Sequence, residues 1–229
     1  MTSLRQLGVL GVALLALVAI GTTAASVAQA GTFTAGAYPA TIASTSPPAF
    51  QFFITKLGFM TCQPSYHGEL TAASEELTLT PTFNPLPVVN TSCERGGAVT
   101  HVNTNGCDFR LRAGEQVEED VVAGTMDIVC PEGKSIEFEI TGSGSPCYLT
   151  VPPQENLTGA PGGSPAANGI FFRNKTPNSV SLQINPGKIR YILSGGCPIT
   201  GEFFDGTYSG GASLIAESEG EGTSFSVDG

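Results

Sequence analysis

The sequence predicts an all-β protein, built as an antiparallel β-sandwich or as two packed β halves, and stapled by disulfides. Three observations predict it. Short segments that alternate apolar and polar residues recur along the chain, as half-buried strands do. No sustained 3.6-residue apolar period follows residue 30, so no significant helix is expected beyond that point. All six cysteines, an even number, also follow residue 30.

The first 30 residues are predicted to be a secretory signal peptide. Arg5 supplies a positive charge, residues 7–20 are almost unbroken apolar, and small residues lead to Ala28-Gln29-Ala30, a cleavage signal. The alternative is a membrane anchor, but the apolar run is short for a bilayer about 30 Å thick. We therefore expect cleavage near Ala30, secretion to the extracellular space or the cell envelope, and no transmembrane segment in the mature chain.

Strands are expected next, separated by turn residues. Residues 50–57 are a dense run of aromatic and β-branched residues, which suits a pleated, half-buried surface. Residues 77–80 alternate leucine with threonine, so both leucines lie on one face. Asn105-Gly106 is a two-residue turn signal. The strands expected up to this region are 31–38, 50–57, 59–62, 77–80, 99–102 and 107–112.

The second half of the chain continues the pattern. Its clearest strand is 135–141, where Ile, Phe and Ile alternate with two glutamates. Residues 113–124 are predicted to be an acidic loop, and residues 152–167, rich in Pro, Gly, Ala and Asn, a long loop. The strands expected here are 125–131, 135–141, 147–151, 169–173, 180–184, 189–193, 203–208 and 209–215.

The domain is expected to span residues 31–215, either as one unit or as two halves, 31–122 and 123–215. Residues 216–229 are rich in Glu, Gly and Ser, so we expect a disordered acidic tail.

Six cysteines in an exported chain indicate three disulfides, and sequence alone leaves 15 pairings open. Cys107 and Cys130 flank the 113–124 loop at similar distances, so a hairpin through this loop would bring them within disulfide range. For the other four cysteines the local choice pairs Cys62 with Cys93 and Cys147 with Cys197. No C-x-x-C spacing is present, which disfavours a redox motif or a zinc site. We expect no metal and no cofactor.

The charge of the chain restricts its partners. The net charge is −10, or −11 once Arg5 is removed with the signal peptide. Such a charge disfavours nucleic acid and simple electrostatic docking on anionic lipid. The expected partner is an extracellular or envelope ligand, whose identity the sequence does not give.

Candidate catalytic residues are few. His67 and His101 are the only histidines and so the only candidate bases for a Ser-His-Asp triad, but no serine stands in a G-x-S-x-G context. Structural or surface roles fit both histidines better, and no catalytic residue is assigned.

The acidic loop is a candidate for metal binding. Glu115, Glu118, Glu119 and Asp120 could offer oxygen ligands to calcium, but they lack the D-x-D-x-D-G spacing that fixes such ligands. A solvated acidic loop fits them better.

Several segments resemble those of a group of exported, cysteine-containing actinobacterial all-β proteins. The shared residues are turns, strand residues and cysteines, so the resemblance implies the fold and the export but carries over no activity and no catalytic residue. The similar segments are 32–42, 77–83, 105–107, 127–136, 147–154 and 205–210.

The sequence therefore favours an exported, non-catalytic binding or structural module at the cell envelope or in the medium. The alternative is a secreted hydrolase with an unrecognised site. A third and weaker hypothesis is a protease inhibitor whose reactive loop is 152–167.

Overall fold

The computed structural model describes residues 30–45, 49–83, 93–142, 144–158, 169–175 and 178–229. Within these ranges the chain forms β-strands and turns, with no helix. The predicted all-β class is confirmed. The strands are β1 (Thr32–Ala35), β2 (Ala40–Ser44), β3 (Gln51–Thr55), β4 (Gly58–Cys62), β5 (Pro64–Leu70), β6 (Glu76–Phe83), β7 (Cys93–Arg95), β8 (Ala98–Asn103), β9 (Asp108–Glu118), β10 (Val121–Val129), β11 (Ile136–Thr141), β12 (Cys147–Val151), β13 (Gln154–Leu157), β14 (Ile170–Lys175), β15 (Ser179–Ile184), β16 (Ile189–Gly195), β17 (Gly201–Ser218), β18 (Glu221–Thr223) and β19 (Phe225–Asp228).

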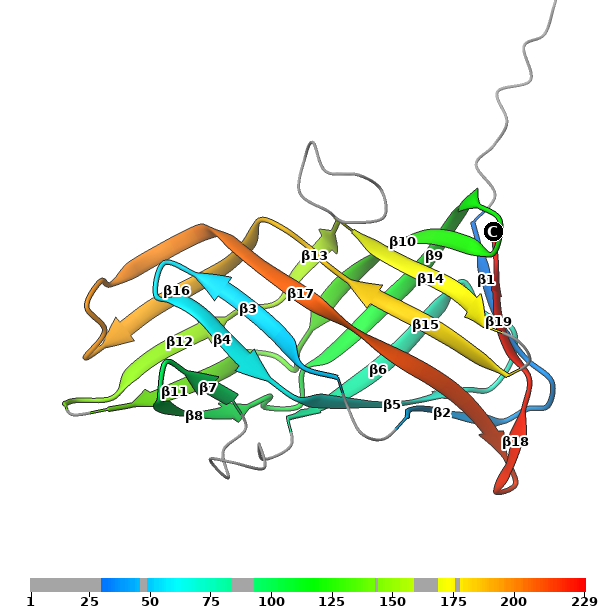
Figure 1. Ribbon diagram of the computed structural model, residues 1–229, viewed down its shortest axis with the longest axis horizontal. Helices are drawn as coiled ribbons and strands as arrows, with labels where there is room; N and C mark the ends of the chain where they lie inside the picture. The colour runs from blue at the N-terminus through cyan, green and yellow to red at the C-terminus, as the bar shows by residue number, and fades with distance from the viewer. Residues whose placement is uncertain (1–29, 46–48, 84–92, 143, 159–168, 176–177) are drawn as a thin grey trace, which may run out of the picture.

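Antiparallel pairing closes the sheets into two rings that lie end to end (Figure 1). The terminal ring, on the right in Figure 1, runs β2-β5-β6-β9-β10-β14-β15-β17 and returns to β2. The disulfide ring, on the left, runs β3-β4-β7-β8-β11-β12-β16-β17 and returns to β3. Only β17 belongs to both rings. The sheets pack together as expected, and their closure is the feature that the sequence does not reveal.

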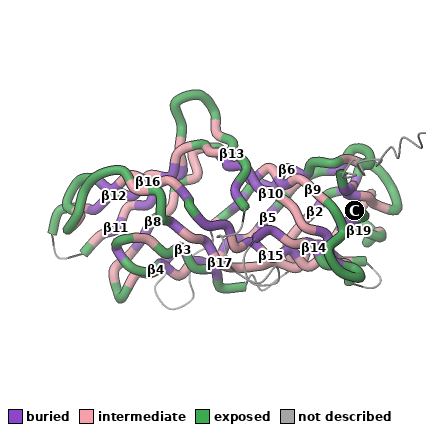
Figure 2. The backbone as a smooth tube through the Cα atoms, turned by 90° about the horizontal axis from the view of Figure 1, so that it is seen from above, coloured by how far each residue is buried: buried purple, intermediate pink, exposed green. Residues whose placement is uncertain are grey.

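The chain passes from one ring to the other after almost every hairpin. Each hairpin, such as β3–β4 or β5–β6, turns back at the far end of its own ring. Followed through both rings, the chain therefore forms eight long composite strands in up-and-down order. Most of these strands are interrupted where the two rings meet. We call this zone the waist. Each ring collects strands from before and after residue 122, so the strands do not pair as two sequence halves. The buried side chains form one cluster that includes both rings. Buried residues, purple in Figure 2, occur in both rings.

Asn105 and Gly106 show how the chain crosses the waist. Both residues have positive φ, 52° and 78°, and the N–H of Cys107 donates to the carbonyl of Thr104 at 2.8 Å. The predicted turn forms, but the strands that it joins, β8 and β9, lie in different rings. It is a crossing and not a hairpin turn.

β17 is the longest strand because small residues let it pass close to its neighbours at the waist. A Cβ added at Gly210 would lie 2.5 Å from Cγ of Gln51, and one added at Gly206 would lie 2.8 Å from the carbonyl oxygen of Ile189. Only glycine fits such approaches. β17 can therefore pair with β3 in one ring and with β2 in the other.

Two expectations about irregular segments are wrong. Residues 113–124 are not a loop, because β9 runs to Glu118, β10 begins at Val121, and only a two-residue turn separates them. The exposed residues of this hairpin are polar, so their composition resembles that of a loop. The tail 216–229 is also not disordered where β17, β18 and β19 run through it. Phe225 and Val227 are buried, and they alternate with polar residues in β19, which pairs with β1.

Three disulfides tie neighbouring strands together. They join Cys62 to Cys93, Cys107 to Cys130 and Cys147 to Cys197. The hairpin predicts the Cys107–Cys130 pair, and the local choice predicts the other two. No helix of the described residues is long and apolar enough to cross a membrane. The predicted signal peptide, up to residue 29, lies outside the described residues.

Candidate functional site

β3 presents unlike residues on its two faces. Gln51 and Phe53 point into the molecule and are 0% and 3% exposed, whereas Phe52 and Ile54 between and after them are 40% and 47% exposed. Phe50, just before the strand, continues the outward set. Alternate residues of a strand face opposite sides, so the outward position of these side chains follows directly from the inward position of Gln51 and Phe53.

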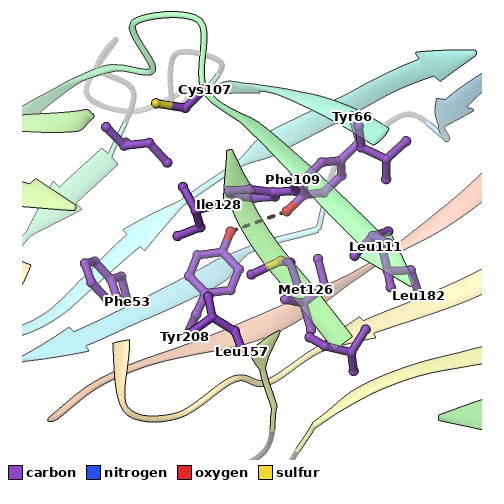
Figure 3. Packing of buried hydrophobic residues seen from close by; sticks show 14 of the residues in the cluster. Phe53, Tyr66, Cys107, Phe109, Leu111, Met126, Ile128, Leu157, Leu182 and Tyr208 are labelled. Carbon is purple, nitrogen blue, oxygen red and sulfur yellow. Dashed lines mark hydrogen bonds between the residues drawn. The ribbon is translucent and has the colours of Figure 1, made fainter. Parts of the chain in front are cut away.

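Gln51 fixes the start of β3 from the inside. The hydroxyl of Tyr66 donates to its Oε1 at 2.7 Å, the hydroxyl of Tyr208 donates to the same atom, and its Nε2 donates to the carbonyl of Gly211 at 3.0 Å. This polar cluster is buried at the waist, and Figure 3 shows the two tyrosines approaching each other beside Phe109. Its members come from β3, β5 and β17, so the cluster joins the two rings.

Burial decides the protonation of the two phenols. It raises the pKa of Tyr66 to about 12, although the hydrogen bonds with Tyr208 and Gln51 lower it somewhat. Burial, and then the charge and the hydrogen bond of Tyr66, raise the pKa of Tyr208 well above 10. Both hydroxyls are therefore neutral donors near neutral pH.

Phe53 fixes the middle of β3 by aromatic packing. Its ring centroid lies 5.8 Å from that of Phe138, 6.1 Å from that of Tyr191 and 6.5 Å from that of Tyr208. Beside it is an apolar cavity of about 30 Å³, which Phe109 and Ile128 also line. A cavity of this size has room for roughly two waters and is too small for a substrate.

The outward residues of β3 continue onto both neighbouring strands. On β4, Phe59 is 60% exposed and stands opposite Ile54. On β17, Phe204 is 61% exposed and lies three residues before Thr207, which pairs with Ile54. We call Phe50, Phe52, Ile54, Phe59 and Phe204 together the aromatic face.

The aromatic face is as large as the largest apolar patch of an ordinary soluble monomer. Its five side chains expose roughly 500 Å² of apolar surface, at about 200 Å² for a whole side chain of this size. The largest apolar patch of an ordinary monomer covers about 300–600 Å² and is often functional.

One ion pair lies between the strands of the aromatic face. Lys56 Nζ lies 2.6 Å from Oδ2 of Asp205, and the hydroxyl of Tyr191 donates to Oδ1 of Asp205 at 3.0 Å. The hydrogen bond from Lys56 is the main reason that the pKa of Asp205 is lowered. The backbone N–H of Lys56 also donates to the hydroxyl of Tyr191, at 2.8 Å. The ion pair thus places a cation and an anion together at the face, and the buried Tyr191 holds Asp205 from below.

The structure does not bring the two histidines together. His67 is exposed on β5 of the terminal ring, where it pairs with Ala43 and Thr80. His101 is exposed on β8 of the disulfide ring, where it pairs with Glu139.

The acidic residues extend along the β9–β10 hairpin and do not converge. Glu115, Glu118 and Glu119 are exposed, and the nearest cation to Glu118 is Arg173, at 3.7 Å. Asp120 occupies the turn with a φ of 60°. Across the part of the chain that the structure describes, no group of three or more His, Cys, Asp or Glu side chains could hold a metal ion.

The predicted 152–167 loop is strand-like where it is described. β13 pairs with β10, and the buried carboxylate of Asp127 accepts the N–H of Asn156 at 2.8 Å. Arg110 and Arg112 each lie 2.7 Å from Oδ2 of Asp127. Residues 159–167, the centre of the proposed inhibitor loop, lie outside the described residues.

Sequence reasoning missed Asp127 and the aromatic face. The signal for Asp127 is its position between the inward-facing Met126 and Ile128, in a strand whose partner carries two arginines on the corresponding face. The signal for the aromatic face is the pair Phe52-Phe53, because adjacent aromatic residues in a strand must lie on opposite faces.

Comparison with family models finds no family that matches the chain, and no curated protein or solved structure shows significant similarity to it.

Proposed function

We propose that the protein is an exported, non-catalytic module that binds its partner through the aromatic face. The observation that carries this proposal is the exposure of five large apolar side chains, four on the adjacent strands β3, β4 and β17 and one, Phe50, just before β3. The inward side chains of these strands already pack in the core, so the fold does not require large apolar side chains on the outward face. The largest apolar patch of a monomer is often a functional surface.

The strands beneath the aromatic face suit a binding surface. The Gln51 cluster, the packing of Phe53 and the hydrogen bond from Lys56 N to Tyr191 all hold β3 from below. A surface held rigidly before binding loses little conformational entropy when a partner docks. The three disulfides support an oxidising, extracellular location.

The alternative, a secreted hydrolase, needs a base close to a nucleophile in a sheltered site. Both histidines are instead exposed and lie in different rings. No specific observation favours this alternative, and the binding module is the better supported function.

Hydroxyl-radical footprinting of residues 31–229 tests the proposal. Oxidation of Phe52 and Phe59 is followed in buffer at low and high protein concentration, and with envelope and medium fractions from the source cells. Tyr148, an exposed residue of β12 on the same ring, is the internal control. We expect selective protection of the two phenylalanines in at least one condition. Equal oxidation of all three residues in every condition would contradict the proposal.

A further inference from the structure

We propose that the partner of the aromatic face is a second copy of this chain, packed face to face about a two-fold axis. The inference depends on the proposed function, since it identifies the occupant of the same binding surface. Three features of the surface carry it: its area, its charges and the closure of the ring.

The apolar area of the face matches what a dimer needs. A stable interface buries about 800 Å² on each partner, of which about 56–65% is apolar, or roughly 500 Å². The five residues of the aromatic face expose roughly this amount. Phenylalanine is also among the residue types that are enriched at interface centres.

The charges of the face are complementary to themselves. In a two-fold interface each contact from one copy is repeated from the other, so only a surface that carries both signs, or neither, can pair with itself. Lys56 and Asp205 supply one charge of each sign. The rest of the chain gives a net charge of −10, which makes two copies repel at long range. An apolar surface with balanced charge is where they can meet.

Closure of the disulfide ring disfavours the other common mode of β-strand association. Every strand of this ring has a paired strand on each side, so only short stretches of edge, such as the start of β4, are left for a second chain. Two copies that meet at this ring therefore associate mainly through the outward side chains of the sheet. The β3–β4 hairpin and β17 present these side chains.

Sedimentation of residues 31–229 over about 1–100 μM tests the inference directly. We expect a monomer–dimer equilibrium that added NaCl strengthens, because salt screens the repulsion between the acidic copies. The F52S/F59S double variant should associate at least about tenfold more weakly. K56E should weaken association by a similar factor, because it replaces the ion pair with two neighbouring negative charges, and NaCl should partly restore it. Y148S is the matched control and should associate like the wild type.

Thermal unfolding of each variant at low concentration establishes that it is folded, and footprinting separates the outcomes. Concentration-dependent protection of Phe52 and Phe59 in the purified protein supports the dimer. A monomer at all concentrations, with protection only by envelope material or by neutral lipid vesicles, overturns the dimer and leaves the proposed function intact. An absence of protection in every condition overturns both.

Discussion

The hydroxyl of Tyr66 donates a hydrogen bond to Oε1 of Gln51 at 2.7 Å, inside the waist and across the boundary between the two rings. Tyr208 donates to the same oxygen, and both phenols are buried. A single amide oxygen therefore accepts hydrogen bonds from two hydroxyls that are buried in the interior. Unsatisfied buried polar groups are expensive, so this amide stabilises the contact between the rings.

Replacing Gln51 by leucine should lower the free energy of unfolding by about 2–4 kcal/mol, because two buried hydroxyls lose their acceptor. Urea unfolding of the variant measures this change. Q116L removes a glutamine that is exposed on β9 and should cost less than about 0.5 kcal/mol. Equal effects of the two substitutions would show that the Gln51 cluster contributes nothing specific.

Alkaline pH should destabilise the protein through Tyr66. Its pKa is about 12 in the folded state, above the value near 10 of an unfolded tyrosine. The stabilising contribution is therefore fully present below about pH 10 and is lost as the pH rises toward about 12. Tyr66→Phe should make the unfolding free energy less dependent on pH between these values. Identical pH profiles of the variant and the wild type would argue against a buried, neutral Tyr66.

Acid should destabilise the protein through Asp127. Burial raises the pKa of its carboxyl, but the hydrogen bond from Asn156 and the charges of Arg110 and Arg112 outweigh burial, and the pKa is lowered. Its contribution is present above the unfolded pKa of about 3.9 and is lost as the pH falls below that value. Asp127→Asn should destabilise the protein at pH 7 by about 2–4 kcal/mol, because it leaves the arginines and Asn156 poorly paired. The difference between the variant and the wild type in urea unfolding should shrink toward pH 3, and a constant difference would contradict this role.

Phe225 tests whether the tail belongs to the fold. It is 3% exposed on β19, so Phe225→Ala should cost about 3–5 kcal/mol of unfolding free energy. Phe204→Ala, at an exposed position, should cost less than about 1 kcal/mol at protein concentrations too low for association. A tail that detaches in solution would make the two substitutions equally mild.

The parts of the fold that depend on local pattern could be predicted from the sequence. Alternation gave most strands, and the up-and-down order explains why the local choice gave the disulfide pairs, since neighbours along the chain are also neighbours in the rings. The closure of β17 against β2 and β3 could not be predicted, because it joins segments that are far apart in the sequence, such as Thr41 with Glu217 and Ile54 with Thr207, with no local signal. The tail was misjudged because its average composition is polar, although Phe225 and Val227 alternate correctly for a strand.

The aromatic face could be predicted only in part. Residues 50–57 indicate a strand with large apolar side chains on both faces, but the sequence does not say which face is inward. The buried position of Gln51 decides this, and a polar residue is a poor predictor of an inward face. The site therefore depends on contacts with Tyr66 and Tyr208, which come from strands distant in the sequence.

The central claim is that β3 serves the fold through its inner face and a partner through its outer face. Urea unfolding of Phe52→Ser and Phe53→Ser at low protein concentration tests it most directly. We predict a loss of about 3–5 kcal/mol for Phe53→Ser and of no more than about 1 kcal/mol for Phe52→Ser. A loss for Phe52→Ser as large as that for Phe53→Ser would show that the outward aromatic residues hold the fold together, and would contradict the account.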